Sequence, residues 1–304
     1  MIFRKQFNKV LLFILVTQIV FSGCSTFAPV PSASENTVPQ QAASENIVQQ
    51  QAASENIVQQ QAVISGSIGD HWVKGNSYLQ SQNIDMAIAE YKKAIELDPK
   101  LVPALSRLGF AYYLKGDLDK AISEFDAALS IDPADSGSYI GRGLAYMAKE
   151  DFNKAITDFT SILEFDPKSI EAYSYRGNAY QKEKEYDKAI ADYTRVIEMD
   201  PVNTRAFYDR GMSYALKSDY ESAIADYTKV IDIGPQYSGV YYNRGLTYHI
   251  KGEYDKAVAD YTKAIELNPK DPRPYNNRGY AYEKLGQYEK AKADLNTAKE
   301  LLSN

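Results

Sequence analysis

From residue 68 onward, apolar and polar positions recur with a strict spacing of 34 residues. The clearest marker is a proline, which stands at Pro99, Pro133, Pro167, Pro201, Pro235 and Pro269. Counting this proline as position 32, we place the starts of the units at residues 68, 102, 136, 170, 204, 238 and 272. Within each unit, apolar residues return at helical spacing in two stretches. The pattern therefore predicts two helices per unit, over about positions 1–14 and 17–30.

Residues that begin and end helices stand at the expected boundaries. Gly116, Gly252 and Gly286 occupy position 15, where a left-handed residue can end the first helix. Asn or Asp at position 16 and Asp, Asn or Ser at position 34 can cap the helix that follows. These caps are Asn83, Asp117, Asp151 and Asp219 at position 16, and Asp135, Ser169, Asn203 and Asp271 at position 34. The proline at position 32 ends the second helix, because proline has no N–H to donate.

Small residues and large aromatic residues each recur at fixed positions of the unit. Glycine fills position 8 and alanine position 20, as in Gly177 and Ala189, while large rings recur at positions 4, 11 and 24. We expect the small residues to let two helix axes approach and the rings to fill the space around the crossing. Bulky residues at either small position should then overpack it.

A 34-residue unit with Gly177, Tyr180, Ala189, Tyr193 and Pro201 at these positions resembles the tetratricopeptide repeat (TPR). The resemblance covers residues 68–304 and implies an all-α fold, a right-handed superhelical solenoid of helix-turn-helix repeats. Seven repeats are expected, over 68–101, 102–135, 136–169, 170–203, 204–237, 238–271 and 272–304. The resemblance says less about function, because repeat folds serve many functions.

A charge pattern follows the same period. Position 7 is basic in six units, as in Arg176 and Arg210, and position 23 is acidic in all seven, as in Asp192 and Asp226. One interpretation is a charged ladder that binds a partner. The favoured one is a row of ion pairs between the two helices of each unit, because the spacing never varies.

Residues 1–23 are typical of a secretion signal peptide. Arg4, Lys5 and Lys9 precede an apolar run from Val10 to Phe21 that is short for a membrane span. The sequence Phe21-Ser22-Gly23-Cys24 resembles a bacterial lipobox, although Phe21 departs from the usual aliphatic residue. That resemblance implies lipidation of Cys24, the only cysteine, and Ser25 after it favours the outer membrane of a two-membrane bacterium. The alternative is an ordinary signal peptide or an uncleaved anchor.

Residues 24–67 are expected to form a lipidated N-terminus and a low-complexity, disordered tether. The decamer SENIVQQQAA recurs with small changes from Ser34, Ser44 and Ser54, and no Lys, Arg or aromatic residue occurs from Ala28 through Asp70. Such a segment cannot bury enough apolar surface to offset its ordering entropy. It serves either as a spacer or as a binding tail.

Tyrosine is abundant, and most of the 25 tyrosines occupy the scaffold positions 4, 11, 17 and 24. The resemblance implies that positions 2, 5, 9, 12 and 13 of the first helices line a concave groove. Four of the six remaining tyrosines fall there. The candidate groove residues are Trp72, Ile140, Tyr208 and Tyr242 at position 5; Asn76, Phe110, Leu144, Asn178, Met212, Leu246 and Tyr280 at position 9; and Tyr113, Met147 and His249 at position 12. Arg205 and Arg273 join them at position 2.

An aromatic groove of this kind predicts binding of a peptide or helix of another protein, since Tyr and Trp are over-represented at binding hot spots. The alternative is that these side chains pack only against neighbouring first helices. A known TPR subtype that clamps C-terminal carboxylates is not expected, because none of its residue sets is complete here.

Several function classes are disfavoured. The net charge of −6 and the lack of a basic stripe argue against nucleic-acid binding. One cysteine and two histidines leave little for a metal centre, and no cofactor motif occurs. The repeats leave no room for a catalytic domain, so we expect no enzyme.

The expected function is that of a lipid-anchored adaptor in the cell envelope, facing the periplasm, which gathers other proteins. It resembles bacterial TPR lipoproteins that act in pilus assembly or with cell-wall hydrolases. The alternatives are a binder of carbohydrate or peptidoglycan fragments that uses Trp72, and a structural, self-assembling solenoid. Leu295 and Leu302 in the last repeat would then meet a second copy in a homodimer.

Overall fold

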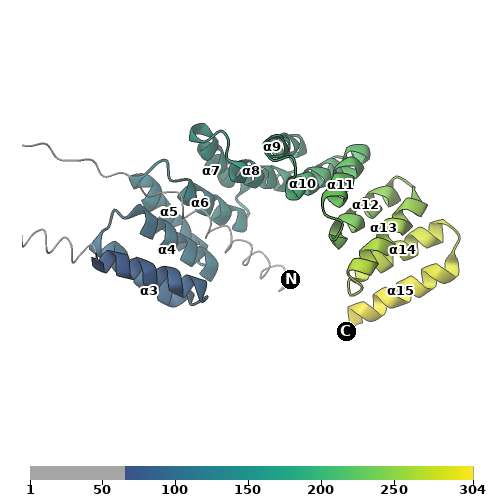
Figure 1. Cartoon of the computed structure of the whole chain (residues 1–304), viewed down its shortest axis with the longest axis horizontal. Coiled ribbons are helices and arrows are strands. Elements are labelled where there is room, and N and C mark those ends of the chain that lie inside the picture. Colours follow the sequence, from purple (N-terminus) through teal and green to yellow (C-terminus); the bar gives the residue numbers. More distant parts are fainter. Residues whose placement is uncertain (1–65, 304) are drawn as a thin grey trace, which may run out of the picture. The chain divides into compact units, whose positions relative to one another are not determined.

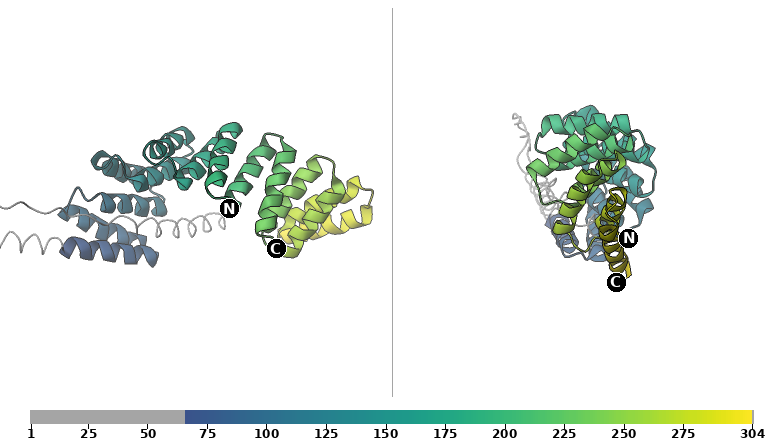
Figure 2. Two further views of the ribbon diagram at one scale, coloured as in Figure 1. Left: turned by 45° about the horizontal axis from the view of Figure 1, so that its top comes forward. Right: turned by 90° about the vertical axis from the view of Figure 1, so that its right-hand side faces the viewer.

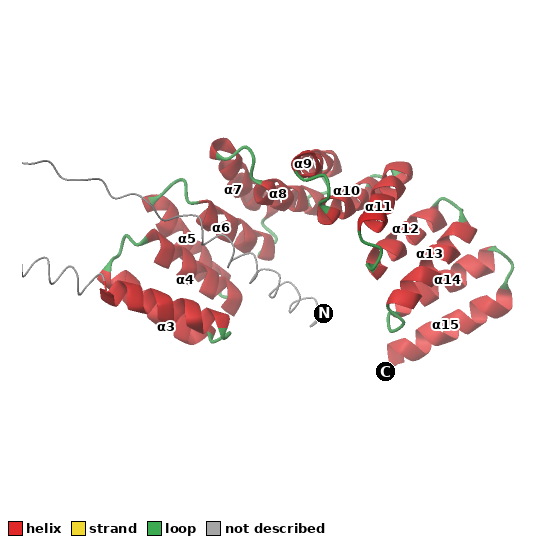
Figure 3. Cartoon of the chain, in the orientation of Figure 1, coloured by secondary structure: helices red, strands yellow, loops and turns green. Residues whose placement is uncertain are grey.

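The computed structural model describes residues 66–303. The expected signal peptide over 1–23, Cys24 and nearly all of the tether lie outside the described residues. Every described element is a helix, and the helices follow one another along the chain in antiparallel pairs (Figure 1, Figure 3). None of them is both long and apolar enough to cross a lipid bilayer.

The helix boundaries follow the 34-residue period. A helix over residues 66–80 is followed by α3. The labelled helices are α3 (Ile84–Leu97), α4 (Val102–Lys115), α5 (Leu118–Ile131), α6 (Ser136–Ala148), α7 (Phe152–Phe165), α8 (Ile170–Lys182), α9 (Tyr186–Met199), α10 (Thr204–Leu216), α11 (Tyr220–Ile233), α12 (Ser238–Ile250), α13 (Tyr254–Leu267), α14 (Pro272–Lys284) and α15 (Tyr288–Ser303). Both helices predicted in each unit are confirmed, with ends within one or two residues of those expected.

The chain divides between Lys149 and Glu150 into two compact units. Unit 1 contains the helix over 66–80 and α3 to α6, and α4 contacts α3, α5 and α6. Its core gathers around Tyr91 and Phe125, both fully buried. Trp72 packs at the edge of this core with its ring 5.9 Å from that of Tyr91.

Unit 2 contains α7 to α15. Each first helix pairs with the second helix of its own repeat, as α10 does with α11, and each also contacts the second helix of the preceding repeat, as α10 does with α9. Successive first helices touch as well, so α8, α10, α12 and α14 form one layer (Figure 2). We call the surface of these four helices the first-helix face.

The glycine at position 8 is required by the ring at position 24 of the same repeat. A Cβ atom on Gly177 would lie 2.9 Å from the Tyr193 ring, and one on Gly211 would lie 2.9 Å from the Tyr227 ring. The last repeat has Leu295 in place of the ring, and its Cγ would lie 2.9 Å from a Cβ on Gly279. The sequence predicted a close helix approach, and the structure shows that a specific side chain fills the gap.

The predicted caps are confirmed. The Asp219 side chain accepts from the Ser222 backbone N–H, and Asn203 accepts from Ala206. Position 15 is left-handed in every repeat, although glycine was expected to serve only three of them. The other four repeats place Gln82, Glu150, Lys184 and Ser218 there, with φ between 59° and 69°.

Candidate partner-binding site

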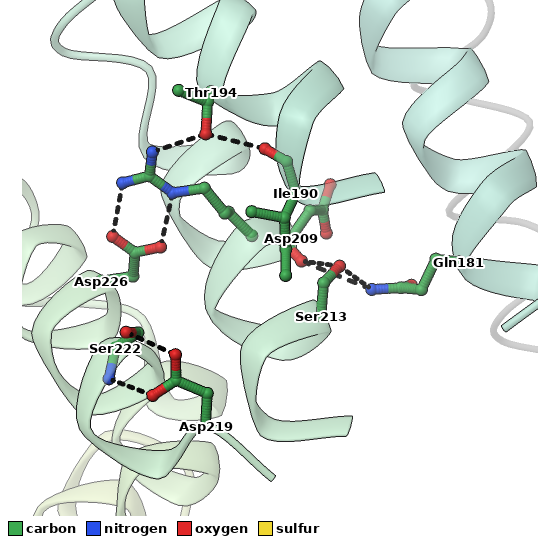
Figure 4. Close-up of polar contacts among 9 residues, drawn as sticks. Gln181, Ile190, Thr194, Asp209, Ser213, Asp219, Ser222 and Asp226 are labelled. Atoms are coloured by element: carbon green, nitrogen blue, oxygen red, sulfur yellow. Dashed lines mark hydrogen bonds and ion pairs between the residues drawn. The ribbon is translucent and has the colours of Figure 1, made fainter. Parts of the chain in front are cut away.

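The arginines of position 7 hold consecutive repeats of unit 2 together. Arg210 donates from Nε and from one terminal nitrogen to the two carboxylate oxygens of Asp226, each over 2.8 Å. Its other terminal nitrogen donates to Thr194 Oγ1, at position 25 of the preceding repeat, over 3.0 Å. Thr194 in turn donates to the Ile190 carbonyl oxygen (Figure 4). The guanidinium therefore joins two neighbouring repeats.

The same network occurs four times in unit 2, counting the Arg210 case. We call it the arginine–aspartate ladder, and its pairs are Arg176–Asp192, Arg210–Asp226, Arg244–Asp260 and Arg278–Asp294. The guanidinium also lies between the rings of positions 4 and 11, as Arg244 does at 5.9 Å from the ring centres of both Tyr241 and Tyr248. The hydrogen bonds to the carboxylate raise the pKa of each of these arginines. These side chains serve the scaffold, so the interpretation as ion pairs within the repeats is confirmed in unit 2.

The first repeat departs from this scheme. Glu90 at position 23 is bound by His71 Nδ1 at 2.6 Å and by Lys93 Nζ at 2.8 Å. Lys74 at position 7 is exposed, so its expected pairing with Glu90 is wrong. A lysine cannot fork around a carboxylate as arginine does, and His71 at position 4 takes that place.

Two tyrosines of the first-helix face are held by asparagines of the next repeat. Asn243 Nδ2 donates to the Tyr208 hydroxyl over 2.7 Å, and Asn277 Nδ2 donates to the Tyr242 hydroxyl over 3.1 Å. The Tyr208 ring lies 6.0 Å from that of Tyr227 at position 24. The hydroxyl of each tyrosine is hydrogen-bonded and its ring packs against another ring. Each tyrosine therefore presents one fixed, half-buried surface.

Two exposed arginines stand at position 2 of the first helices α10 and α14 on this face. The Arg205 side chain is 67% exposed, and its Nε donates to Asp209 over 2.5 Å. Arg273 is 64% exposed, is held by the cap Asp271, and has its guanidinium carbon 5.0 Å from the centre of the Tyr242 ring. Burial raises the pKa of the Tyr208 hydroxyl, and the charges of Arg205 and Arg273 both oppose that rise.

Asp209 forms the centre of a buried polar cluster between α8 and α10. Gln181 Nε2 donates to Ser213 Oγ over 3.0 Å, and Ser213 Oγ donates to the Asp209 carbonyl oxygen over 2.9 Å (Figure 4). The Asp209 carboxylate is buried, and its Oδ1 has no hydrogen-bond partner among the described residues. Burial raises the pKa of this carboxyl, against the opposing effect of Arg205.

The other predicted groove residues are spread over both units. In unit 2, Tyr280 is 47% exposed and Leu246 is also exposed. The half-buried candidates are Asn178, Met212 and His249 in unit 2 and Trp72, Asn76, Tyr113, Leu144 and Met147 in unit 1. Asn76 Oδ1 accepts a hydrogen bond from the Tyr91 hydroxyl over 2.7 Å, so this side chain serves the scaffold.

Two predicted groove residues, Phe110 and Ile140, are buried instead. Phe110 meets the Phe125 ring edge-on with centres 5.1 Å apart and belongs to the core of unit 1. Ile140 stands on α6, whose Gly141 is so close to Phe125 that an added Cβ would lie 2.2 Å from that ring. The packing of α4 and α6 around Phe125 of α5 leaves these two side chains less than a tenth exposed, so neither belongs to the candidate site.

The sequence analysis did not identify three residues of the first-helix face. Asn243, Asn277 and Asp209 all stand at position 6, which the groove positions did not include. Asparagine at position 6 in two successive repeats, each after a repeat with tyrosine at position 5, was the available signal.

Family models of the TPR match most of the described chain. One, described as TPR repeat, matches residues 75–116, 143–184, 211–252 and 247–286. Others, described as tetratricopeptide repeat, match residues 170–203 and 272–304, and 102–135. The chain belongs to the tetratricopeptide repeat family. TPR domains typically serve as non-enzymatic scaffolds that bind proteins or peptides.

Solved structures share this TPR fold. A TPR protein from Parabacteroides merdae is 21% identical, with a TM-score of 0.62 over 77% of this chain and 93% of that one. YrrB, described as a TPR protein with an unusual peptide-binding site, is 23% identical, with a TM-score of 0.53 over 62% and 97%. MamA is 28% identical, with a TM-score of 0.51 over 53% and 94%. A comparison with curated protein sequences finds no significant match.

Between residues 66 and 303, no three His, Cys, Asp or Glu side chains are grouped so as to hold a metal ion.

Proposed function

We propose that this TPR protein is a membrane-anchored adaptor that binds a peptide or helix of a partner protein on the first-helix face of unit 2. The observation that carries the proposal is the row formed by Tyr208 and Tyr242, each held by an asparagine of the next repeat. Side chains held in this way lose little conformational entropy when a partner covers them, which favours binding.

Exposed apolar surface continues beside this row. Tyr280 on α14 and Leu246 on α12 both stand at position 9 and are exposed. Ile250, one turn beyond Leu246, is exposed as well. Tyrosine surfaces of this kind are common in binding hot spots. A partner segment that follows α10, α12 and α14 would cover rings and aliphatic side chains in turn.

The anchor belongs to the same proposal. A lipid on Cys24 would hold the protein on a membrane without spanning it, at the outer membrane and facing the periplasm. The tether after Cys24 would separate the repeats from the membrane by on the order of 35–40 Å. The support is the sequence around Cys24 and the composition of residues 25–65.

The binding face is tested by replacing both held tyrosines. The variant Tyr208→Ala/Tyr242→Ala should lose the proteins that crosslink to the natural chain in intact envelopes. The matched control is Tyr288→Ala, because Tyr288 is 70% exposed but stands on the second helix α15. Equal recovery of partners by the natural chain and the double variant, both folded by circular dichroism, would remove the proposal.

The anchor is tested separately by Cys24→Ala and membrane fractionation. We expect the natural chain in the membrane fraction and the variant in the soluble fraction. If both chains fractionate alike, Cys24 is not the anchor.

Nothing seen in residues 66–303 supports either of the two alternative functions. Trp72, on which a carbohydrate site would rest, packs against Tyr91 at the edge of the unit 1 core. Leu295, one of the two residues expected at a dimer contact, packs against Gly279 in its own hairpin. Only Leu302 of that pair is exposed.

A further inference from the structure

The second helix of the last repeat, α15, differs from the earlier second helices at two positions. In the first six repeats, position 21 is Ile or Val and position 28 is Ile or Leu. All twelve of these side chains are buried or half-buried. In α15 the same positions are Lys292 and Lys299, and both lysines are exposed. Two apolar positions of the repeat have therefore become charged on one helix.

Positions 21 and 28 are places where one repeat meets the next. Val258, at position 21, packs against the apolar cluster that contains Ala281, at position 10 of the following repeat. Ile231, at position 28, packs against the cluster that contains Val240, at position 3 of the following repeat. The face of a second helix that bears these two positions is therefore the face on which the next first helix stacks.

The rest of this face of α15 is also changed or uncovered. Tyr288 at position 17 is 70% exposed, whereas Tyr254 at the same position of the preceding repeat is half-buried. Position 25 holds Thr262 in that preceding repeat, where its hydroxyl accepts a hydrogen bond of 2.9 Å from Arg278 of the last repeat. In α15 position 25 is Asn296, which is exposed.

The first repeat carries the matching change on the face of its first helix where a preceding repeat would stack. Position 3 is uncharged and buried in all later repeats, as Ala104, Ser138, Ala172, Ala206, Val240 and Pro274. In the helix over 66–80 it is Asp70, and this side chain is exposed. Lys74, at position 7 of the same helix, is exposed as well. We call this face and the corresponding face of α15 the end faces.

We propose that the charged residues of the two end faces prevent copies of this chain from stacking end to end. An apolar end face would offer a second copy the same contact that joins consecutive repeats, which is why repeat proteins need polar surfaces at their ends. Lysine or aspartate at these positions would lose hydration in such a contact, which costs free energy. The inference goes beyond the proposed function, because it concerns faces on which no partner is proposed to bind.

Pairing between opposite charges does not compensate for this cost. If the helix over 66–80 of a second copy stacked on α15 as consecutive repeats do, Lys299 would meet Asp70, since positions 28 and 3 belong to one cluster. Lys292 would meet the uncharged Ser77 at position 10, and Lys74 would meet the uncharged Asn296. One ion pair would thus be formed while two charges were buried without a partner, and an unpaired buried charge is strongly unfavourable.

The test co-expresses two copies of the full chain with different affinity tags and measures how much of one copy is recovered with the other. Natural copies should not recover each other. Lys292→Ile/Lys299→Ile restores apolar residues to the end face of α15, and recovery should rise roughly tenfold or more. The matched control is Lys229→Ile/Lys263→Ile, which changes two exposed lysines at position 26 of α11 and α13. This control should behave as the natural chain does.

A second measurement does not depend on how the double variant folds. The urea midpoint of the natural chain should not change with protein concentration, because association of folded copies would raise it. Lys299→Ile should leave the midpoint unchanged, since α15 has no helix over this position. Ile265→Lys, at the same position of α13, should lower the midpoint, because Ile265 is half-buried and α13 is in contact with α14.

Association of Lys292→Ile/Lys299→Ile alone, together with a constant urea midpoint for the natural chain, would establish that the lysines keep copies apart. A double variant that recovers no more of its second copy than the control does would overturn the inference. Natural copies that recover each other, and that stop doing so in Asp70→Ala/Lys299→Ala, would overturn it as well, because the end faces would then join copies.

Discussion

Arg210 and Asp226 meet through two parallel hydrogen bonds of 2.8 Å, and the same guanidinium reaches Thr194 of the preceding repeat. Each nitrogen of the guanidinium donates one hydrogen bond in this network. The Asp226 side chain is almost fully buried. A buried charge without its partner is strongly unfavourable. The ladder therefore joins neighbouring repeats of unit 2, and those repeats supply the helices of the first-helix face.

The first prediction concerns that ladder. Arg210→Met should lower the free energy of unfolding by about 3–5 kcal/mol, because it leaves Asp226 buried without a counter-charge. Arg210→Lys should cost less, about 1–3 kcal/mol, since it keeps the charge and loses the fork. Urea unfolding measures both. The control Arg195→Lys should change the free energy of unfolding by no more than about 0.5 kcal/mol. If the control loses as much stability as Arg210→Lys, the paired hydrogen bonds of Arg210 contribute no more than an exposed ion pair does.

The second prediction concerns the glycine under the ring. Gly211→Ala would place a Cβ 2.9 Å from the Tyr227 ring, and we expect it to destabilise the protein by about 1–3 kcal/mol. Gly239→Ala near the start of α12 meets nothing within 4 Å and should stabilise by roughly 0.5–1 kcal/mol. Thermal melts of the two variants should move in opposite directions. Shifts of the same sign would contradict the assignment of position 8.

The third prediction concerns the left-handed turn residues. Ser218 has φ +69°, a conformation that costs an ordinary residue roughly 1 kcal/mol more than glycine. Ser218→Gly should therefore raise stability by up to about that amount. Gly252→Ala, at the equivalent position with φ +80°, should lower it by a similar amount. A melt in which Ser218→Gly is no more stable than the natural chain would argue against this turn.

The fourth prediction concerns pH. Burial raises the native pKa of Asp209 above its usual range, so the native state keeps a proton that the unfolded state has already lost. This carboxyl therefore removes stability as pH rises from about 4, the ordinary aspartate pKa, through the native pKa. Asp209→Asn should remove that loss, so the variant should gain stability relative to the natural chain across this window. Urea midpoints at a series of pH values measure the difference, and a difference that does not change with pH would disprove the burial effect.

Much of the fold was predictable because each repeat carries the same local sequence signals. The caps such as Asp219, the proline stops and the glycine at position 8 act within one hairpin, so one sequence period reveals them. The left-handed conformation of Ser218 was missed because serine gives no local sign of it. Position in the repeat decides that conformation, and the tertiary fold overrides the preference of the residue.

The site was predictable only in part. Position 9 places Phe110 in the core of unit 1 but leaves Tyr280 exposed in unit 2, because burial depends on which side chains the neighbouring helices bring. The asparagine contacts to Tyr208 and Tyr242 join successive repeats, and such contacts are not visible within a single repeat. The threonine at position 25 was a missed signal of the same kind, since its recurrence marks the second contact of the ladder arginine.

The central claim, that the first-helix face of unit 2 meets the partner, is tested most directly by photo-crosslinking in intact cells. A photoreactive phenylalanine analogue is placed at Tyr280 on α14 in one chain and at Tyr288 on α15 in another. We expect a discrete crosslinked partner from position 280, none from position 288, and loss of the product when Tyr208→Ala/Tyr242→Ala is added. The same product from both positions, or from position 288 alone, would contradict the account.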